Sequence, residues 1–167
     1  MDTDESVVDY QIFPIYPLDE YPVWITRLYA SMSPRDIRTM CWSTDDPPCY
    51  YTGFVKWASD KKALFLVLDG DNIAAMFAMT DVVSGEQCNI AGWSSPAYRG
   101  AETTIIFKIA TEWLHDHMKM KRLYVFTPWP TARGLSLRAG YKEVATIPEY
   151  FQGTRSKALH ILMSEKE

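Results

Sequence analysis

The segment Ser94-Ser95-Pro96-Ala97-Tyr98-Arg99-Gly100-Ala101-Glu102-Thr103-Thr104 connects a short strand pattern to the longest helical pattern of the chain. The strand is predicted over Gln87 to Trp93, directly after a Ser84-Gly85 turn. The helix is predicted over Thr103 to Met120, because apolar side chains recur there on one stripe: Ile106, Ile109, Ala110, Trp113 and Leu114. The segment therefore predicts a strand–loop–helix unit, and the elements on either side of it decide the fold.

The first half of the chain predicts a strand, two helices and three strands. These elements are Val7 to Tyr16, Asp19 to Ser31, Arg35 to Met40, Lys62 to Leu68, Asn72 to Thr80 and Gln87 to Trp93. Pro14 and Pro17 favour an edge position or an early end for the first strand, because proline cannot donate to a sheet. Ser33 is a predicted N-cap, and Asp69-Gly70-Asp71 predicts a hairpin turn. Thr44 to Gly53 is predicted as a loop.

The second half predicts two helices and three strands. After the long helix, Arg122 to Thr127 is a predicted strand, and Pro130 to Ala139 a short helix that Gly140 ends. Tyr141 to Phe151 and Lys157 to Met163 are the last two predicted strands. The chain has no internal repeat and no linker, so residues 7–164 are expected to form one α+β domain behind a flexible acidic segment, residues 1–6.

The composition excludes several classes of protein. Of 167 residues, 47% are hydrophobic and 23% are charged, which is typical of a globular domain. The net charge of −4 argues against a general nucleic-acid-binding protein. No apolar run approaches the roughly 20 residues of a membrane span. Cys41, Cys49 and Cys88 form no CxxC pair, so free thiols and a cytoplasmic location are expected.

The order β-αα-βββ-α-β-α-ββ resembles that of the GCN5-related N-acetyltransferases (GNAT), and two motifs support the resemblance. Ser95-Pro96-Ala97-Tyr98-Arg99-Gly100 is similar to the P-x-x-R-G start of that family's acetyl-CoA segment. The second motif is the family's N-x-x-A-x-x-L-Y-x-K-x-G-F element, whose spacing is matched by Ala132, Leu135, Arg138, Gly140 and Tyr141. The resemblance covers roughly Lys62 to Met163. It implies a mixed, mostly antiparallel sheet of about seven strands flanked by about four helices.

The resemblance also implies a splay of the sheet and acetyl-CoA as the cofactor. The splay is expected between the strand ending at Trp93 and the strand Arg122 to Thr127. The implied cofactor-binding residues are Trp93, Ser94, Ser95, Tyr98, Arg99, Gly100, Ala101, Glu102, Thr103, Thr104 and Trp129. In the family, small residues in this loop leave backbone N–H groups at a helix N-terminus open to the CoA pyrophosphate.

Two substitutions in this loop predict weak or lost acetyl-CoA binding. Glu102 and Thr104 stand where the family has small residues, and a carboxylate near the phosphates would repel them. The alternative is that Glu102 simply complements the helix dipole in the first turn. Trp129 stands where the family often has Asn and would either plug the splay or pack ordinarily.

The catalytic candidates are one hydroxyl and two carboxylates. Ser136 stands where the family has its general-acid tyrosine, and a serine hydroxyl is a much weaker acid. Glu86 and Asp81 are the carboxylates nearest the place expected for a general base, and each could equally be a solvated turn residue. His115 and His117 point away from each other on a helix, so no metal site is predicted.

Two functions follow from these observations. The first is an acyl-CoA-dependent N-acyltransferase with a degenerate acetyl-CoA loop, whose acceptor is a small amine, a protein N-terminus or a lysine. The second is a non-catalytic GNAT-like binding or assembly protein, such as a bacteriophage virion or head-assembly component, in the host cytoplasm or the virion. Its partner would be another protein or a second copy of the chain. The predicted acceptor or partner surface is Tyr50, Tyr51, Phe54 and Trp57.

Overall fold

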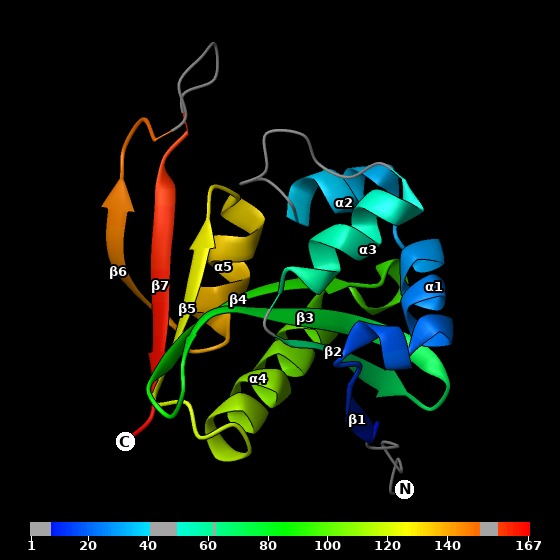
Figure 1. Cartoon of the computed structure of the whole chain (residues 1–167). Coiled ribbons are helices and arrows are strands. Elements are labelled where there is room, and N and C mark those ends of the chain that lie inside the picture. The colour runs from blue at the N-terminus through cyan, green and yellow to red at the C-terminus, as the bar shows by residue number, and fades with distance from the viewer. Residues whose placement is uncertain (1–7, 41–49, 62, 151–156) are drawn as a thin grey trace, which may run out of the picture.

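The computed structural model describes residues 8–40, 50–61, 63–150 and 157–167 (Figure 1). The strands are β1 (Tyr10–Pro14), β2 (Ala63–Asp69), β3 (Asn72–Val83), β4 (Gln87–Ser94), β5 (Arg122–Thr127), β6 (Lys142–Ile147) and β7 (Leu159–Glu165). The helices are α1 (Pro22–Ser31), α2 (Pro34–Met40), α3 (Tyr51–Ser59), α4 (Ala101–Asp116) and α5 (Pro130–Arg138), with short 3₁₀ helices η1 (Leu18–Glu20) and η2 (Pro96–Tyr98). No helix in these ranges is long and apolar enough to cross a membrane.

One mixed sheet with the order β1-β2-β3-β4-β5-β7-β6 lies between α1, α2 and α3 on one face and α4 on the other (Figure 1). Each face carries a hydrophobic core. The β4–β5 pair is parallel, and all other neighbours are antiparallel. Along β2, Leu64 and Leu66 pack under α1, α2 and α3, whereas Phe65 and Val67 pack against α4 on the other face. The predicted α+β domain, with its mostly antiparallel seven-stranded sheet, is confirmed.

The sheet is splayed between β4 and β5, as predicted. Gln87 pairs with Arg122, Cys88 with Leu123 and Asn89 with Tyr124, and no later pair of the two strands is in register. Five residues of β4 and three of β5 follow these pairs, so the two strands diverge. We call this gap the β4–β5 opening.

Most predicted turns and caps are present. The Ser33 hydroxyl accepts the backbone N–H of Asp36 at 3.1 Å, and Asp36 accepts the backbone N–H of Ser33 at 3.0 Å, which is a capping box. Gly140 follows α5 with φ +95°, a conformation that favours glycine. β1 lies at the edge of the sheet and ends at Pro14.

Several predicted boundaries were wrong, and one helix was missed. The predicted helix Asp19 to Ser31 begins only at Pro22, because proline suits the first helical position. β3 is three residues longer than predicted, and β6 ends at Ile147. Helix α3 occupies the end of the predicted loop Thr44 to Gly53, whose residues 44–49 lie outside the described ranges. Phe54, Trp57 and Ala58, at helical spacing, were the unused signal for α3.

Helix α3 places the four aromatic residues of the predicted surface in two different environments. Phe54 and Trp57 are 0% and 8% exposed and belong to the core under α1 to α3. Tyr50 is 79% exposed, and Tyr51 is 38% exposed. The surface available to an acceptor or partner is therefore reduced to the two tyrosines, and their role remains a prediction.

Replacing Phe54 by alanine is expected to lower the free energy of unfolding by about 3–5 kcal/mol, because the ring is fully buried. Tyr50→Ala is the matched control, and its effect is expected to stay within about 0.5 kcal/mol. Urea denaturation measures both values. Equal losses for the two variants would contradict the division of the aromatic residues into core and surface.

Candidate functional site

Helix α4 begins beside the end of β4 with an uncapped N-terminus. Its N-cap residue, Gly100, has φ +97° and offers no side chain to the first turn. A residue with a Cβ would be strained at this φ, although nothing lies within 4 Å of the Cβ position. The first N–H groups of an α-helix have no partner inside the helix, and the dipole favours an anion there. The amides of Ala101, Glu102 and Thr103 thus form a site suited to a phosphate.

The Glu102 side chain turns away from the helix axis toward the edge strand β1. Its Oε2 accepts a hydrogen bond from the Tyr10 hydroxyl at 2.7 Å. Beside it, the Tyr98 hydroxyl donates to Asp69 Oδ2 at 2.7 Å, and the rings of Tyr10 and Tyr98 meet edge to face. Burial and the hydrogen bond to Glu102 raise the pKa of Tyr10, so its hydroxyl remains a donor at neutral pH. This geometry favours the interpretation in which Glu102 faces away from a bound phosphate.

Arg99 connects the loop after β4 to helix α2. Its Nη2 lies 2.9 Å from Asp36 Oδ1, and its Nε donates to the Ser94 carbonyl at 3.3 Å. Burial alone would raise the pKa of Asp36, but hydrogen bonds from Ser33 and Arg99 outweigh burial and hold it below its usual value. The indole N–H of Trp93 also contributes to the lowered pKa of Asp36. Within the described residues, however, this N–H group makes no hydrogen bond of good geometry. Arg99 therefore positions α2 against the loop.

Among the described residues, one face of the β4–β5 opening is filled by a hydrophobic core, and the other face is filled by neither core. On the face covered by α4 and α5, Cys88, Leu123 and Val125 pack into the hydrophobic core against α4. Side chains alternate along a strand, so Asn89 and Tyr124 point to the opposite face. Tyr124 is not part of the core under α1 to α3. A small molecule can therefore approach the opening from the Asn89–Tyr124 side.

Asp81 lies beside the point at which β4 and β5 diverge. The register between β3 and β4 breaks between Thr80 and Val83, and in this bulge Asp81 has φ +50°. Bulges redirect side chains and are common next to active sites. The Asn89 side-chain amide donates to Asp81 Oδ2 at 2.8 Å, which fixes the carboxylate next to the last paired residue of β4.

Glu86, the other predicted base, lies at the paired end of the two strands. Its Oε1 is 2.8 Å from Lys121 Nζ and its Oε2 is 3.8 Å from Arg122 Nη2. The hydrogen bond from Lys121 lowers the pKa of Glu86, which makes it a weaker proton acceptor. The structure thus brings Asp81, and not Glu86, to the opening.

Ser136 and Trp129 both have structural contacts. The buried Ser136 hydroxyl donates to the Ala132 carbonyl at 2.9 Å within α5. Trp129 precedes α5, and its indole N–H donates to the Thr39 carbonyl of α2 at 3.0 Å. Lys157 Nζ lies 4.1 Å from the centroid of a Trp129 ring. Trp129 therefore connects the end of β5 to α2 across the wide end of the opening.

His115 and His117 both have packing contacts. His115 is buried, with Nδ1 2.6 Å from the Met120 carbonyl and Nε2 3.0 Å from the Ser164 hydroxyl. His117 follows α4, and its ring stacks on Trp113 at a centroid distance of 5.2 Å. In the described ranges, no group of three or more His, Cys, Asp or Glu side chains could hold a metal ion.

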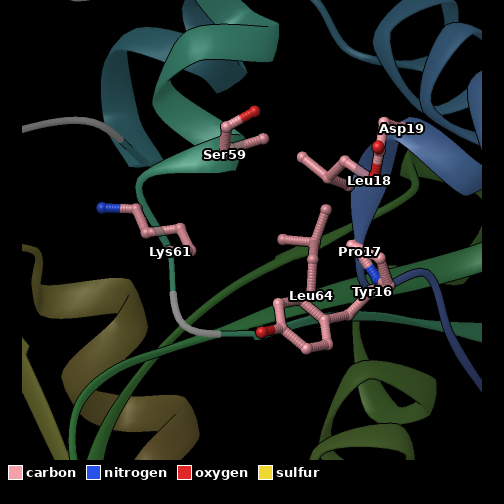
Figure 2. A pocket seen from close by; sticks show the side chains of 8 residues that line it. Tyr16, Pro17, Leu18, Asp19, Ser59, Lys61 and Leu64 are labelled. Atoms are coloured by element: carbon pink, nitrogen blue, oxygen red, sulfur yellow. The ribbon is translucent and has the colours of Figure 1, made fainter.

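Two of the hollows formed by described residues lie outside the β4–β5 opening. One, of about 220 Å³, lies between η1, the end of α3 and β2, and Figure 2 shows Leu18 and Leu64 pointing into it while the Lys61 amino group points away. The other, of about 510 Å³, lies between α1 and the Ser95–Tyr98 turn and includes Arg27 and Asn72. Neither is lined by residues of β5.

Solved structures of acetyltransferases have the same fold. Spermidine N-acetyltransferase from Vibrio cholerae, crystallised with CoA and spermine, matches with a TM-score of 0.72 and 12% identity, over 93% of this chain and 95% of that one. A proposed phosphinothricin N-acetyltransferase matches with a TM-score of 0.67 and 14% identity, over 94% and 98% of the two chains. No protein-family model and no curated sequence matches the chain. The GNAT fold expected from the sequence is confirmed.

Tyr10→Phe is expected to lower the affinity for acetyl-CoA about threefold to fivefold, because it releases the Glu102 carboxylate toward the end of α4, where one charge near a phosphate costs about 1 kcal/mol. Glu102→Gln alone is expected to change the affinity by less than about twofold, since Tyr10 already holds the carboxylate away. Isothermal titration calorimetry measures both effects. In the double variant the loss from Tyr10→Phe should vanish, and a loss that persists there would contradict the role assigned to Tyr10.

Asp36→Ala is expected to lower the free energy of unfolding by about 1 kcal/mol at pH 7, because the capping box and the Arg99 ion pair are lost. The pKa of Asp36 is lower in the folded chain, so its contribution is present above the unfolded-state pKa and disappears as the pH falls through the folded-state pKa. Urea denaturation from neutral to acidic pH measures this difference. Phe54→Ala is the control, because it removes no titratable group and its loss should not depend on pH; a pH-independent loss in Asp36→Ala would refute the ionic contribution.

Proposed function

We propose that the protein is an acyl-CoA-dependent N-acyltransferase that moves an acetyl group from acetyl-CoA to an amine. The observation that carries this proposal is the divergence of β4 and β5 beside the uncapped N-terminus of α4. A thioester needs a gap that it can enter, and a pyrophosphate needs exposed N–H donors. Both features lie at the end of β4.

The backbone of β4 would polarise the thioester carbonyl. The Ser95 N–H donates to the Ala74 carbonyl on β3 at 2.9 Å, so this amide is already engaged. N–H groups of an antiparallel strand alternate between its two sides, which directs the amides of Gly92 and Ser94 toward the opening. Preorganised donors of this kind stabilise the negative oxygen that forms during acyl transfer.

The acceptor amine would enter from the Asn89–Tyr124 side. After the ammonium group has lost one proton, its nitrogen lone pair would attack the thioester carbonyl carbon; the C–N bond would form and the C–S bond would break. The second proton, lost by the acylated nitrogen, would end on the departing sulfur. We assign Asp81, held by Asn89, to binding the ammonium group and accepting its proton, directly or through one water. Positioning supplies most of the rate enhancement in such a reaction.

We also propose that the protein is cytoplasmic. Cys88 is a free, buried thiol, and burial raises its pKa to about 12. Such a thiol is unreactive and suits a reducing compartment.

One observation favours the second candidate, a binding or assembly protein such as a component of a bacteriophage virion. Trp129 connects β5 to α2 across the wide end of the opening, where a pantetheine arm would have to pass. In that case the fold would serve partner binding alone, through Tyr50 and Tyr51. Titration of the wild-type chain with acetyl-CoA separates the two candidates, because the second one predicts no binding.

Asp81→Asn is expected to lower kcat/KM for the amine about 100-fold, the usual contribution of a general base, while the Kd for acetyl-CoA stays unchanged. Asparagine tolerates positive φ, so the bulge is retained. The full chain is assayed by thiol release from acetyl-CoA with a panel of primary amines. Glu86→Gln, at the paired end of the strands, is the control and should keep its activity within a factor of about two.

Wild-type turnover that is unaffected by Asp81→Asn would contradict the role of Asp81 but not the reaction. Absence of thiol release with every amine, together with absence of acetyl-CoA binding, would refute the proposed function itself.

A further inference from the structure

We infer that the acceptor is a primary amine that carries an aromatic or aliphatic group. We further infer that an apolar strip on β5 and β7, on the face opposite α4 and α5, binds this group. The inference rests on the proposed function and names its second substrate by chemical class. The acceptor strip consists of Tyr124, Phe126, Ile161 and Met163. It begins at the β4–β5 opening.

The register of β5 against β7 brings the four side chains of the acceptor strip together. Tyr124 lies opposite Met163, and Phe126 lies opposite Ile161, so each pair points to the same face. Tyr124 is also in register with Asn89, whose amide holds the Asp81 carboxylate. The strip thus continues directly from the place where the ammonium group would bind.

Among the described residues, neither helical layer covers the acceptor strip. Its four members belong to neither hydrophobic core, and α5 packs on the other face, where Val125 and Leu162 point. All four side chains are half-buried, and the rings of Tyr124 and Phe126 lie 6.3 Å apart. The strip offers apolar contact and one polar group at its end, which are the two kinds of contact that bind and orient a small molecule.

The charges near the acceptor strip suit one ammonium group and not a polycation. Asp81 is the carboxylate at the opening. In the described part of this face, Lys142 is in register with Met163, and Arg122 with Glu165, so positive charge lies beside the strip and beside the Glu165 carboxylate. Glu143 is directed to the other face, where it pairs with Arg133 of α5. A second cationic group on the acceptor would therefore meet cations.

The test compares 2-phenylethylamine with 1,4-diaminobutane as acceptors for the full chain saturated with acetyl-CoA. The expected kcat/KM is at least about tenfold higher for 2-phenylethylamine, because its ring buries more area on the strip and the second ammonium group of 1,4-diaminobutane would meet Lys142 and Arg122. Phe126→Ala is expected to raise the KM for 2-phenylethylamine about tenfold and to leave the KM for acetyl-CoA unchanged. If the alanine variant does not fold, Phe126→Leu replaces it, with a smaller expected rise in the KM for 2-phenylethylamine. The control is Val144→Ala, a 49% exposed site on β6 outside the strip.

Binding of 2-phenylethylamine is also measured by saturation-transfer NMR on wild type and Phe126→Ala, and this readout needs no acetyl-CoA. Loss of the signal in Phe126→Ala alone supports the strip even if no acetyl transfer is detected. Acetyl transfer with a preference for 1,4-diaminobutane, or an NMR signal that Phe126→Ala leaves unchanged, overturns the acceptor assignment and leaves the proposed function intact. A lower sedimentation mass of Phe126→Ala with unchanged amine binding also overturns it, because the strip would then join two copies of the chain.

Discussion

The parallel contact between β4 and β5 is three residue pairs long, and the position at which it stops determines the rest of the site. Beyond Asn89 and Tyr124 the two strand edges keep N–H and C=O groups that do not bond to each other. Such groups are costly to bury without partners, so the gap must face water or a ligand. Helix α4 packs across one face of the sheet and contacts both sides of the gap. Phe107 of α4 stacks on Phe77 of β3 and on Tyr141 before β6, at centroid distances of 5.9 and 5.0 Å.

Helix α2 is attached to both sides of this gap. On the β4 side, the Arg99–Asp36 ion pair holds the N-terminal turn of α2. On the β5 side, Trp129 donates to the carbonyl of Thr39 near the other end of the same helix. A seven-residue helix has little stability of its own, so these two contacts and the burial of Ile37 keep it in place. Arg99 is thus a structural residue of the loop as well as part of the sequence motif.

The sequence predicted the fold well because its strongest signals are local. The Asp69-Gly70-Asp71 turn, the Ser33 cap and the Gly140 stop each depend on a few neighbouring residues, and each lies where predicted. Helix α3 was missed because Tyr50 and Tyr51 stand next to a Pro-Pro turn signal, which hid the helical spacing of Phe54, Trp57 and Ala58. Composition alone could not separate buried from exposed aromatic residues in that segment.

The site was less predictable because its contacts join residues far apart in the chain. The hydrogen bond from Tyr10 to Glu102 spans 92 positions, and the Arg99–Asp36 pair spans 63. No pattern within the loop reveals that Glu102 turns toward β1. Asp81 and Glu86 are equivalent in sequence, and only the bulge and the cations around Glu86 distinguish them. The acceptor strip depends on the register of β5 against β7, and the sequence of either strand alone does not reveal this register.

A crystal structure of the chain with CoA would show whether the β4–β5 opening admits a thioester beside the N-terminus of α4. We expect the pyrophosphate on the amides of Ala101 to Thr103 and the sulfur between β4 and β5 beyond Asn89 and Tyr124, with the Trp129 ring displaced from Thr39. CoA bound elsewhere on the chain, or no CoA at saturating concentration with Trp129 still bonded to Thr39, would contradict this expectation.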